Sequence, residues 1–310
     1  MKRTEIQRKF ETLRLSVTSS CNFSCFYCAP KQTNQLKSLP SLTADEYCSL
    51  VKKIHDINNL TTVRITGGEP LLFQDIEKII GSLKNMGIKK VSLTTNGSRL
   101  GVKAEKLKHA GLDEMNISLD AVENENFKNI SGYNTISPVL EGIQKTIEAG
   151  IPVKLNCTIL KGYNEDQILP VLDYAVKNNI VVRFLEFMKM GILYSRHTDY
   201  FYPEVEILRT IAEKYRFSPI ERKISSTARY WRLENGLKFG IIANHSTPFC
   251  HDCNRLRMDS TGKIYGCLSN NQGFNIIDEI DIQSILNSAL YQKQKINFTG
   301  SSLIMKSIGG

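Results

Sequence analysis

Three cysteines lie within eight residues near the start of the chain, in the segment Cys21-Asn-Phe-Ser-Cys25-Phe-Tyr-Cys28. The spacing Cys-x3-Cys-x2-Cys lets one loop turn three sulfurs toward a common centre. Thiolates are the usual ligands of iron–sulfur clusters, and four of them normally saturate a [4Fe–4S] cube. Three leave one iron without a protein ligand, and a metal that reacts with a substrate needs such an open position. The spacing therefore favours a [4Fe–4S] cluster over zinc or unrelated thiols. We call these residues the first thiol site.

A second group of three cysteines lies near the C-terminus and is called the second thiol site here. It consists of Cys250, Cys253 and Cys267, and again no fourth thiol is nearby. A histidine, His245 or His251, could instead complete a zinc site of the Cys3His type. The two remaining cysteines are expected to be ordinary buried residues: Cys48 and Cys157.

The elements that must position these thiols alternate between strand and helix. Apolar residues recur at a period of two at 13–18, 63–66, 90–95, 115–119, 153–160 and 180–187, which predicts strands. Helical spacing predicts helices at 43–54, 76–87, 102–111, 137–147 and 164–177. Such alternation is typical of an α/β fold with a parallel sheet, whose active site lies at the carboxyl ends of the strands. Six units fall short of the eight of a closed barrel, so we expect an open, partial six-unit β/α barrel of TIM type.

The pattern changes after residue 188. A helix is predicted at 205–212, followed by extended segments at 228–233 and 237–242. We therefore predict two regions, a barrel at 1–220 and a C-terminal region at 221–310 that carries the second thiol site and binds substrate. The C-terminal region has too few periodic elements for a core of its own, so we expect it to cap the barrel mouth. The glycine-ended tail is expected to be mobile.

Composition favours a cytoplasmic, water-soluble protein. The chain has 310 residues, of which 41% are hydrophobic and 23% charged, without a segment long enough for a membrane span or a secretory signal. Many cysteines without a signal favour metal binding in a reducing compartment. The net charge of +9 could attract a polyanion, but no long basic block is present. The informative arginines lie instead in or beside strands and cysteine motifs, which favours a small phosphorylated ligand over nucleic acid: Arg14, Arg64, Arg183, Arg255 and Arg257.

The cysteine loop, with an aromatic residue at Tyr27, resembles the radical S-adenosylmethionine (SAM) superfamily, and Gly67-Gly68-Glu69-Pro70 resembles its SAM-binding loop. A wider set of motifs is similar to the molybdenum cofactor biosynthesis protein A family, the GTP 3′,8-cyclases. These motifs are Leu13-Arg-Leu-Ser-Val-Thr, Arg64-Ile-Thr-Gly-Gly-Glu-Pro, Leu93-Thr-Thr-Asn-Gly, Asn116-Ile-Ser-Leu-Asp, Arg183-Phe-Leu-Glu-Phe-Met, Cys253-Asn-Arg-Leu-Arg and the Gly309-Gly310 end.

The resemblance implies two [4Fe–4S] clusters and SAM as cofactors. The first cluster, on Cys21, Cys25 and Cys28, would bind SAM at its open iron and cleave it reductively. The second, on Cys250, Cys253 and Cys267, would offer its open iron to a guanine ring. The positions that contact SAM in the family match Tyr27, Gly68, Ser118 and Met188.

The resemblance also implies GTP as the substrate. The positions that hold GTP match Arg14, Arg64, Thr94, Lys154, Arg255, Leu256 and Arg257. The 5′-deoxyadenosyl radical would take the ribose 3′ hydrogen and the carbon radical would attack C8 of guanine. An electron and a proton would complete 3′,8-cyclo-7,8-dihydro-GTP, the first intermediate of molybdopterin synthesis. The family's tail enters the active site, so the catalytic residues implied are Gly309, Gly310 and Arg183.

Arginines have a physical reason to hold a triphosphate, because the planar guanidinium fork matches phosphate oxygens. Arg255 and Arg257 are two residues apart, so in a strand they point to the same side. This pair disfavours a peptide-maturing radical enzyme, since a peptide needs no triphosphate clamp. Implied partners are an electron donor of the flavodoxin or ferredoxin kind and the next pathway enzyme, which would receive the product; a homodimer stays open. No nucleic acid and no membrane are expected as partners.

Some positions depart from the family pattern. Thr62 stands where a basic residue is usual, Ser19-Ser20 replaces Asp-Arg before the first cysteine, and Ala29 replaces Met. The change at Thr62 removes a candidate phosphate contact. These departures leave open a diverged enzyme that acts on another nucleotide or on a peptide, and the net charge leaves open a zinc-bearing RNA-binding protein.

Overall fold

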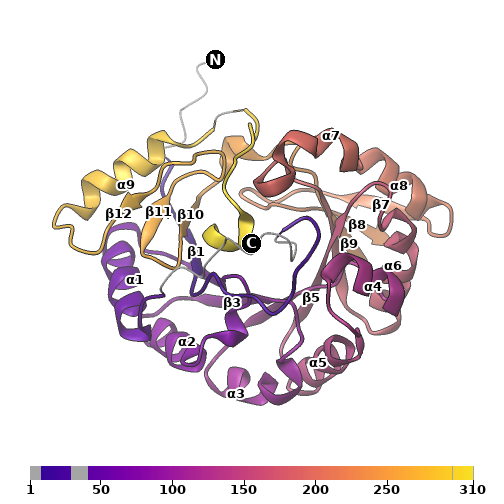
Figure 1. Ribbon diagram of the computed structural model, residues 1–310, viewed down its shortest axis with the longest axis horizontal. Coiled ribbons are helices and arrows are strands. Elements are labelled where there is room, and N and C mark those ends of the chain that lie inside the picture. The colour runs from indigo at the N-terminus through magenta and orange to yellow at the C-terminus, as the bar shows by residue number, and fades with distance from the viewer. Residues whose placement is uncertain (1–7, 29–40, 295, 310) are drawn as a thin grey trace.

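The computed structural model describes residues 8–28, 41–294 and 296–309 (Figure 1). In these ranges twelve strands form one sheet, in the order β12-β11-β10-β1-β2-β3-β4-β5-β6-β9-β8-β7. The sheet is curved, with helices along its outer side and the C-terminal segment over its middle (Figure 1). The predicted α/β fold with a parallel sheet is confirmed.

The predicted alternation of strand and helix is also confirmed. The six central strands are parallel neighbours in chain order: β1 (Thr12–Ser16), β2 (Thr62–Thr66), β3 (Lys90–Thr95), β4 (Glu114–Ser118), β5 (Val153–Ile159) and β6 (Val181–Glu186). The helices between them are α1 (Ala44–Asn58), α2 (Ile76–Asn85), α3 (Ala104–His109), α4 (Asn124–Ser131), α5 (Ser137–Glu148) and α6 (Ile168–Lys177). Helix α1 begins at a capping box, in which Thr43 and Glu46 satisfy each other's backbone N–H groups.

Side chains on the central strands alternate between two environments. On the outer side, apolar residues pack against the helices and are fully buried: Leu13, Leu15, Val63, Ile65, Val91, Leu93, Met115, Ile117, Leu155, Cys157, Val182 and Phe184. Each such side chain stabilises the fold by roughly 1.5–3 kcal/mol. A slip of one residue would exchange the two faces, so this burial fixes the register. The concave side consequently receives the intervening residues, which are mostly polar.

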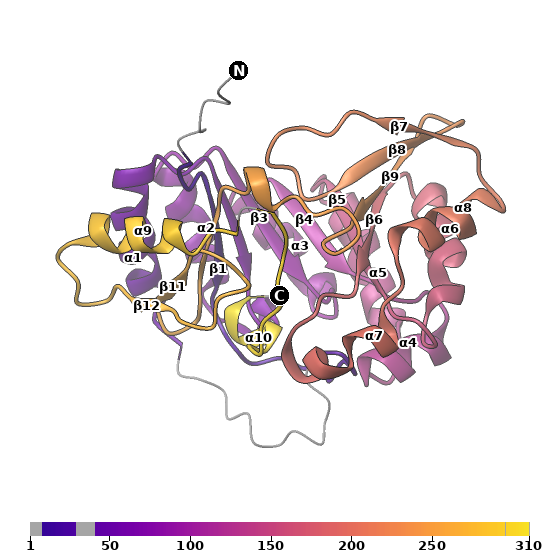
Figure 2. The ribbon, with the colours of Figure 1, turned by 90° about the horizontal axis from the view of Figure 1, so that it is seen from above.

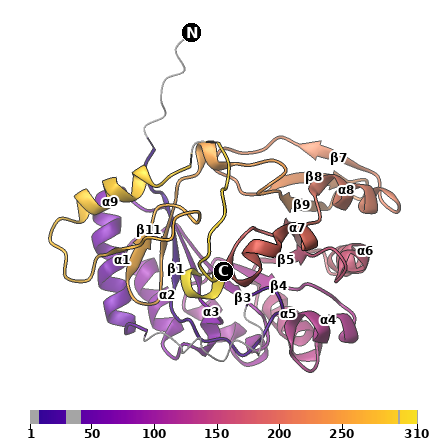
Figure 3. The ribbon, with the colours of Figure 1, turned by 45° about the horizontal axis from the view of Figure 1, so that its top comes forward.

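The C-terminal part extends the sheet at both edges (Figures 2 and 3). Beside β6 lie β9 (Lys238–Ile242), β8 (Arg229–Leu233) and β7 (Phe217–Ile220), and beside β1 lie β10 (Arg255–Met258), β11 (Lys263–Tyr265) and β12 (Phe274–Asn275). The remaining helices are α7 (His197–Tyr200), α8 (Glu204–Ala212), α9 (Ile282–Tyr291) and α10 (Met305–Ile308). We expected this region to lie across the mouth of the sheet. Its strands satisfy the unpaired backbone groups of β1 and β6, and the segment that ends in α10 lies over the middle (Figure 1).

Two apolar residues at the starts of the helices predicted at 102–111 and 205–212 are exposed. Val102 is 82% exposed, because α3 begins only at Ala104. Val205 is 58% exposed, and α8 buries Ile207 and Ile211 instead. The predicted burial of the two cysteines outside the thiol sites is confirmed: Cys48 and Cys157. In the described ranges, no helix combines the length and apolarity that crossing a bilayer requires.

Candidate active site

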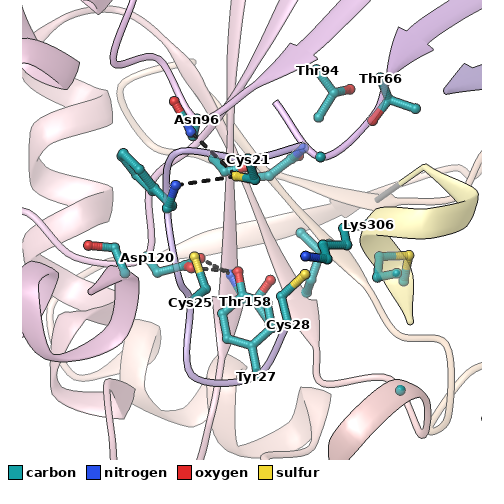
Figure 4. A pocket seen from close by; sticks show the side chains of 18 of the residues that line it. Cys21, Cys25, Tyr27, Cys28, Thr66, Thr94, Asn96, Asp120, Thr158 and Lys306 are labelled. Atoms are coloured by element: carbon teal, nitrogen blue, oxygen red, sulfur yellow. Dashed lines mark hydrogen bonds between the residues drawn. The ribbon is translucent and has the colours of Figure 1, made fainter. Parts of the chain in front are cut away.

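The first thiol site follows the carboxyl end of β1. Cys21, Cys25 and Cys28 line one cavity of about 230 Å³, and the loop that carries them curls around it (Figure 4). Burial raises the pKa of the Cys21 thiol to about 11 and also raises the pKa values of Cys25 and Cys28. These thiols are therefore protonated without a cation, and metal binding would have to displace the protons. Three thiols that line one cavity, with no fourth cysteine beside them, fit a cluster with one open iron.

The segment Gly67-Gly68-Glu69-Pro70, which resembles a SAM-binding loop and is called the SAM loop here, packs directly against the cysteine loop. The Gly68 N–H donates to the Thr18 carbonyl at 2.6 Å, and the Glu69 N–H donates to the Ser20 carbonyl at 2.7 Å. The fully buried Glu69 carboxylate accepts the Thr95 hydroxyl at 2.6 Å and the Asn96 N–H at 2.7 Å. Glu69 thus ties the loops after β1, β2 and β3 together, with its backbone N–H bonded to the first and its carboxylate to the third.

All four predicted SAM contacts line this cavity: Tyr27, Gly68, Ser118 and Met188. Two predicted GTP contacts line it as well, Arg14 and Thr94. Sequence reasoning did not single out five further lining residues: Asn96, Asp120, Asn156, Thr158 and Lys306. Four of these five lie in or just after β3, β4 and β5, so their position near the carboxyl end of a strand was the available signal.

Asp120 lines the cavity and holds two of its other lining residues in place. Its carboxylate accepts the Tyr27 hydroxyl at 2.7 Å and the Thr158 N–H at 2.8 Å. Burial raises the pKa of Asp120 to about 6, and these two hydrogen bonds only partly oppose it. The site therefore holds a carboxylate that changes charge near neutral pH, beside the thiol of Cys25.

Replacing Asp120 by asparagine is expected to flatten the stability profile of the cluster-free chain between pH 4 and 6. Because the folded-state pKa lies above the ordinary 3.8, the folded chain holds more protons in this window and parent stability falls as pH rises. The fall amounts to about 3 kcal/mol for a shift of about two pKa units. Denaturant unfolding at several pH values measures it. A variant that keeps the parent slope would contradict the assignment.

Five arginines lie on four strands of the sheet, β1, β2, β6 and β10, and Arg14 is within electrostatic range of the other four. Arg14 on β1 lies opposite both Arg64 on β2 and Arg257 on β10 in the strand register. Burial and then the charges of the other arginines lower the pKa of Arg14, and lower the pKa values of Arg64 and Arg257 to about 10. Among the described residues, no carboxylate forms a salt bridge with any member of the group: Arg14, Arg64, Arg183, Arg255 and Arg257. A partly buried cluster of cations that forms no salt bridge within the described residues is chemically suited to bind an anion.

Two other predicted site residues, Lys154 and Arg183, bond to side chains of the protein itself. Lys154 forms an ion pair with Glu114 at 2.5 Å, and Glu114 also pairs with Lys90. Arg183 donates to Asn156 at 2.9 Å and to Asn116. Leu256 is fully buried with its side chain in the core, on the face opposite to that of its two arginine neighbours, so only its backbone faces the arginines' side.

The second thiol site lies beside the arginines. The charges of Cys267 and Cys253 affect the pKa of Cys250, and the same two charges affect the pKa of Arg257. Burial would raise the pKa of Cys253, but Arg255 and Lys293 outweigh it and lower that pKa to about 6. Arg257 also acts on Arg14, which lines the cavity of the first thiol site. The arginines therefore connect the two thiol sites.

The zinc alternative gains no support from the histidines. His245 packs edge-on against Phe201 and near His197, and the side chain of His251 is 64% exposed. Within the described ranges, no three His, Cys, Asp or Glu side chains are placed to hold a single ion. Each thiolate of an iron–sulfur cube binds a different iron, so cluster ligands need no common point.

The chain's end lies in the site. The Gly309 carbonyl accepts a hydrogen bond from Arg257 at 2.6 Å, Ile308 is 2% exposed, and Lys306 lines the first cavity. The hydrogen bond of Gly309 and the burial of Ile308 place these residues in the site, and the expected mobility of the tail stays a prediction. Gly310 lies outside the described residues.

Comparison with known families divides the chain near the end of α6, before β6. Residues 15–175 match the Radical SAM superfamily, and residues 180–298 match Molybdenum Cofactor Synthesis C. A protein called GTP 3′,8-cyclase from Staphylococcus aureus strain JH9 is 36% identical over 299 residues, covering 94% of this chain and 86% of that one. Its counterpart from strain MRSA252 is 38% identical over 282 residues, covering 88% and 83%.

Solved structures share the fold at low identity. Streptococcus suis SuiB bound to precursor peptide SuiA has a TM-score of 0.70 and 15% identity, covering 92% of this chain and 66% of that one. Native anSMEcpe with bound AdoMet has a TM-score of 0.65 and 16% identity, covering 91% and 82%. The present chain is thus similar to about two thirds of SuiB, and at these identities the likeness extends to the fold alone.

Proposed function

The chain belongs to the radical SAM superfamily and, within it, to the family of the GTP 3′,8-cyclases, and from this membership we propose that it converts GTP to 3′,8-cyclo-7,8-dihydro-GTP in molybdenum cofactor biosynthesis. One observation carries the proposal. Five arginines that form no salt bridge with a carboxylate of the described residues lie beside two groups of three thiols. A polyanionic nucleotide is the kind of ligand that such a site lacks.

The first thiol site suits the superfamily's cluster and SAM. Cys21, Cys25 and Cys28 would hold the cluster, and when bound it lets SAM supply a 5′-deoxyadenosyl radical that removes the ribose 3′ hydrogen. The chain's own residues shape the space for it. Gly68 keeps the SAM loop against the cysteine loop, and Tyr27, fixed by Asp120, forms part of the wall. The partly enclosed cavity would limit the access of water to a reactive intermediate.

The substrate's triphosphate would lie on the arginine cluster. Arg14, Arg64 and Arg257 would donate to phosphate oxygens, and the ligand's charge would relieve their mutual repulsion. Arg183 is held by two asparagines, which orient its guanidinium within the same group. Lys154 would have to share its charge between Glu114 and the nucleotide. Thr62 offers no charge, so the arginines carry the binding.

Further assignments complete the proposal. The second thiol site would hold a second [4Fe–4S] cluster that binds guanine, and Gly309 and Gly310 would serve catalysis at the end of the chain. The curved sheet is a partial barrel of TIM type, with residues 1–220 as the barrel and 221–310 as the C-terminal region. An electron donor of the flavodoxin or ferredoxin kind reduces the chain, and the next pathway enzyme takes its product.

Anaerobic reconstitution tests the proposal. We expect about eight irons per chain, four per cluster, and a guanine-derived cyclic product from GTP, SAM and a reductant. Formation of 5′-deoxyadenosine without that product would remove GTP as the substrate, and a peptide crosslink found by mass spectrometry would point to a peptide-maturing enzyme. Zinc without iron or sulfide would overturn the radical mechanism as a whole.

A further inference from the structure

A lysine outside every motif named above touches the second thiol site. The Lys293 ammonium lies 3.2 Å from the Cys253 sulfur and also donates to the Arg255 carbonyl. It stands over the ring of the fully buried Phe10, 5.3 Å from the ring centroid. An N–H donor at this distance from sulfur is a hydrogen bond, and the aromatic face is a second attractive contact for the cation.

The segment that carries Lys293 is built against the same thiol site at a second point. Just before it, the Gln292 side chain accepts the N–H of Gly266 at 2.8 Å, and Gly266 directly precedes Cys267. A Cβ at Gly266 would lie only 1.7 Å from the Ala289 carbonyl, so helix α9 packs against the backbone there. Residues 289–293 therefore contact the Cys253 sulfur and the backbone beside Cys267, and Lys293 is held in place.

We propose that Lys293 is a positioning residue of the second cluster: its ammonium donates a charged hydrogen bond to the Cys253 thiolate and makes the bound cluster easier to reduce. The inference rests on the proposed second cluster. Reduction adds negative charge to the cluster and its sulfurs, and hydrogen bonds to sulfur and nearby net charge set the potential of such clusters. A fixed cation at Cys253 stabilises the reduced state more than the oxidised one.

The test compares the full-length chain with Lys293→Met and Lys293→Arg. All are reconstituted in a Cys21→Ser, Cys25→Ser, Cys28→Ser background, so that only the second cluster contributes to the spectrum. Lys263→Met is the matched control, because Lys263 is an exposed residue of β11 and its loss changes the net charge equally. Redox titration followed by electron paramagnetic resonance gives the midpoint potential.

We expect Lys293→Met to shift the midpoint to a more negative potential, and Lys293→Arg and Lys263→Met to stay near the parent. A fully loaded Lys293→Met with the parent potential overturns the proposal, as does an equal shift in Lys293→Arg. Loss of the cluster from Lys293→Met alone supports the charged contact, whereas loss from both Lys293 variants overturns it. If the parent itself holds no iron in this background, the proposed second cluster is wrong, and iron analysis shows this before any variant is compared.

Discussion

Replacing Arg14 by methionine is expected to raise the unfolding midpoint of the ligand-free chain while it weakens GTP binding by roughly 10- to 100-fold. A hydrogen bond to a charged group contributes about 1.5–3 kcal/mol, and each 1.4 kcal/mol is about tenfold in affinity. Arg14 makes no hydrogen bond or salt bridge to another described residue, and the charges of four other arginines act on it. Its removal therefore relieves repulsion without breaking a contact in the ligand-free chain.

The raised unfolding midpoint and the weakened GTP binding together distinguish a ligand-binding arginine from a structural one. An arginine that stabilised the fold would lower the midpoint when removed, and GTP affinity would change little. Thermal unfolding without nucleotide and calorimetric titration with GTP measure the two quantities separately. Arg232→Met is the matched control, because Arg232 is exposed on β8 and removes the same charge at a distance from the cluster. A lowered midpoint with unchanged affinity would show that Arg14 is structural.

The position of the arginines follows from strand register. Arg14 and Arg64 occupy equivalent positions of β1 and β2, and Arg257 joins them because β10 pairs in parallel with the other side of β1. Their neighbours on each strand, such as Leu13 and Leu15, are buried against helices. Burial of these apolar residues therefore holds three guanidinium groups together although they repel one another. Binding of a polyanion would release this stored repulsion.

The central fold was predictable because short segments of the sequence determine its strands and helices. Alternating apolar residues gave β1 to β6, and the capping box at Thr43 marked the start of α1. Strands β8 and β9 match the extended segments predicted at 228–233 and 237–242, whereas β11 and β12 contain three and two residues, too few for a period to appear. Helix α4 was missed since its segment Asn124–Ser131 carries only Phe127 and Ile130 as large apolar residues.

The site was predictable where the chemistry lies in a compact motif. The first thiol site and its glycine loop are contiguous in sequence, and the structure brings them together. Lys293 carried no comparable signal, because its contact with Cys253 spans 40 residues and depends on how α9 packs. Asp120 stood in a motif, yet its two partners, Tyr27 and Thr158, come from other loops. Such long-range contacts are set by tertiary packing, which spacing in the sequence does not encode.

Replacing Gly68 by alanine is expected to abolish the first cluster and to destabilise the chain by at least about 1–3 kcal/mol, the usual range for overpacking. A Cβ at this position would lie 2.3 Å from the Ser20 carbonyl oxygen and 2.7 Å from its carbon. Both are backbone atoms that cannot rotate away. The cysteine loop must therefore move, and the three thiols lose their common geometry. Iron analysis after reconstitution, without SAM, should give about four irons fewer per chain than the parent.

Gly81→Ala is the matched control. Gly81 lies within α2, where an added Cβ meets nothing within 4 Å, so alanine is expected to stabilise the chain by about 0.5–1 kcal/mol. Omitting SAM from the iron assay separates two roles of the glycine loop. A loop that only contacts SAM would keep its full iron content in Gly68→Ala and lose SAM binding alone. If the glycine loop also shapes the cysteine loop, Gly68→Ala loses the first cluster before SAM is added. The 2.3 Å between an added Cβ and the Ser20 carbonyl oxygen favours this second role.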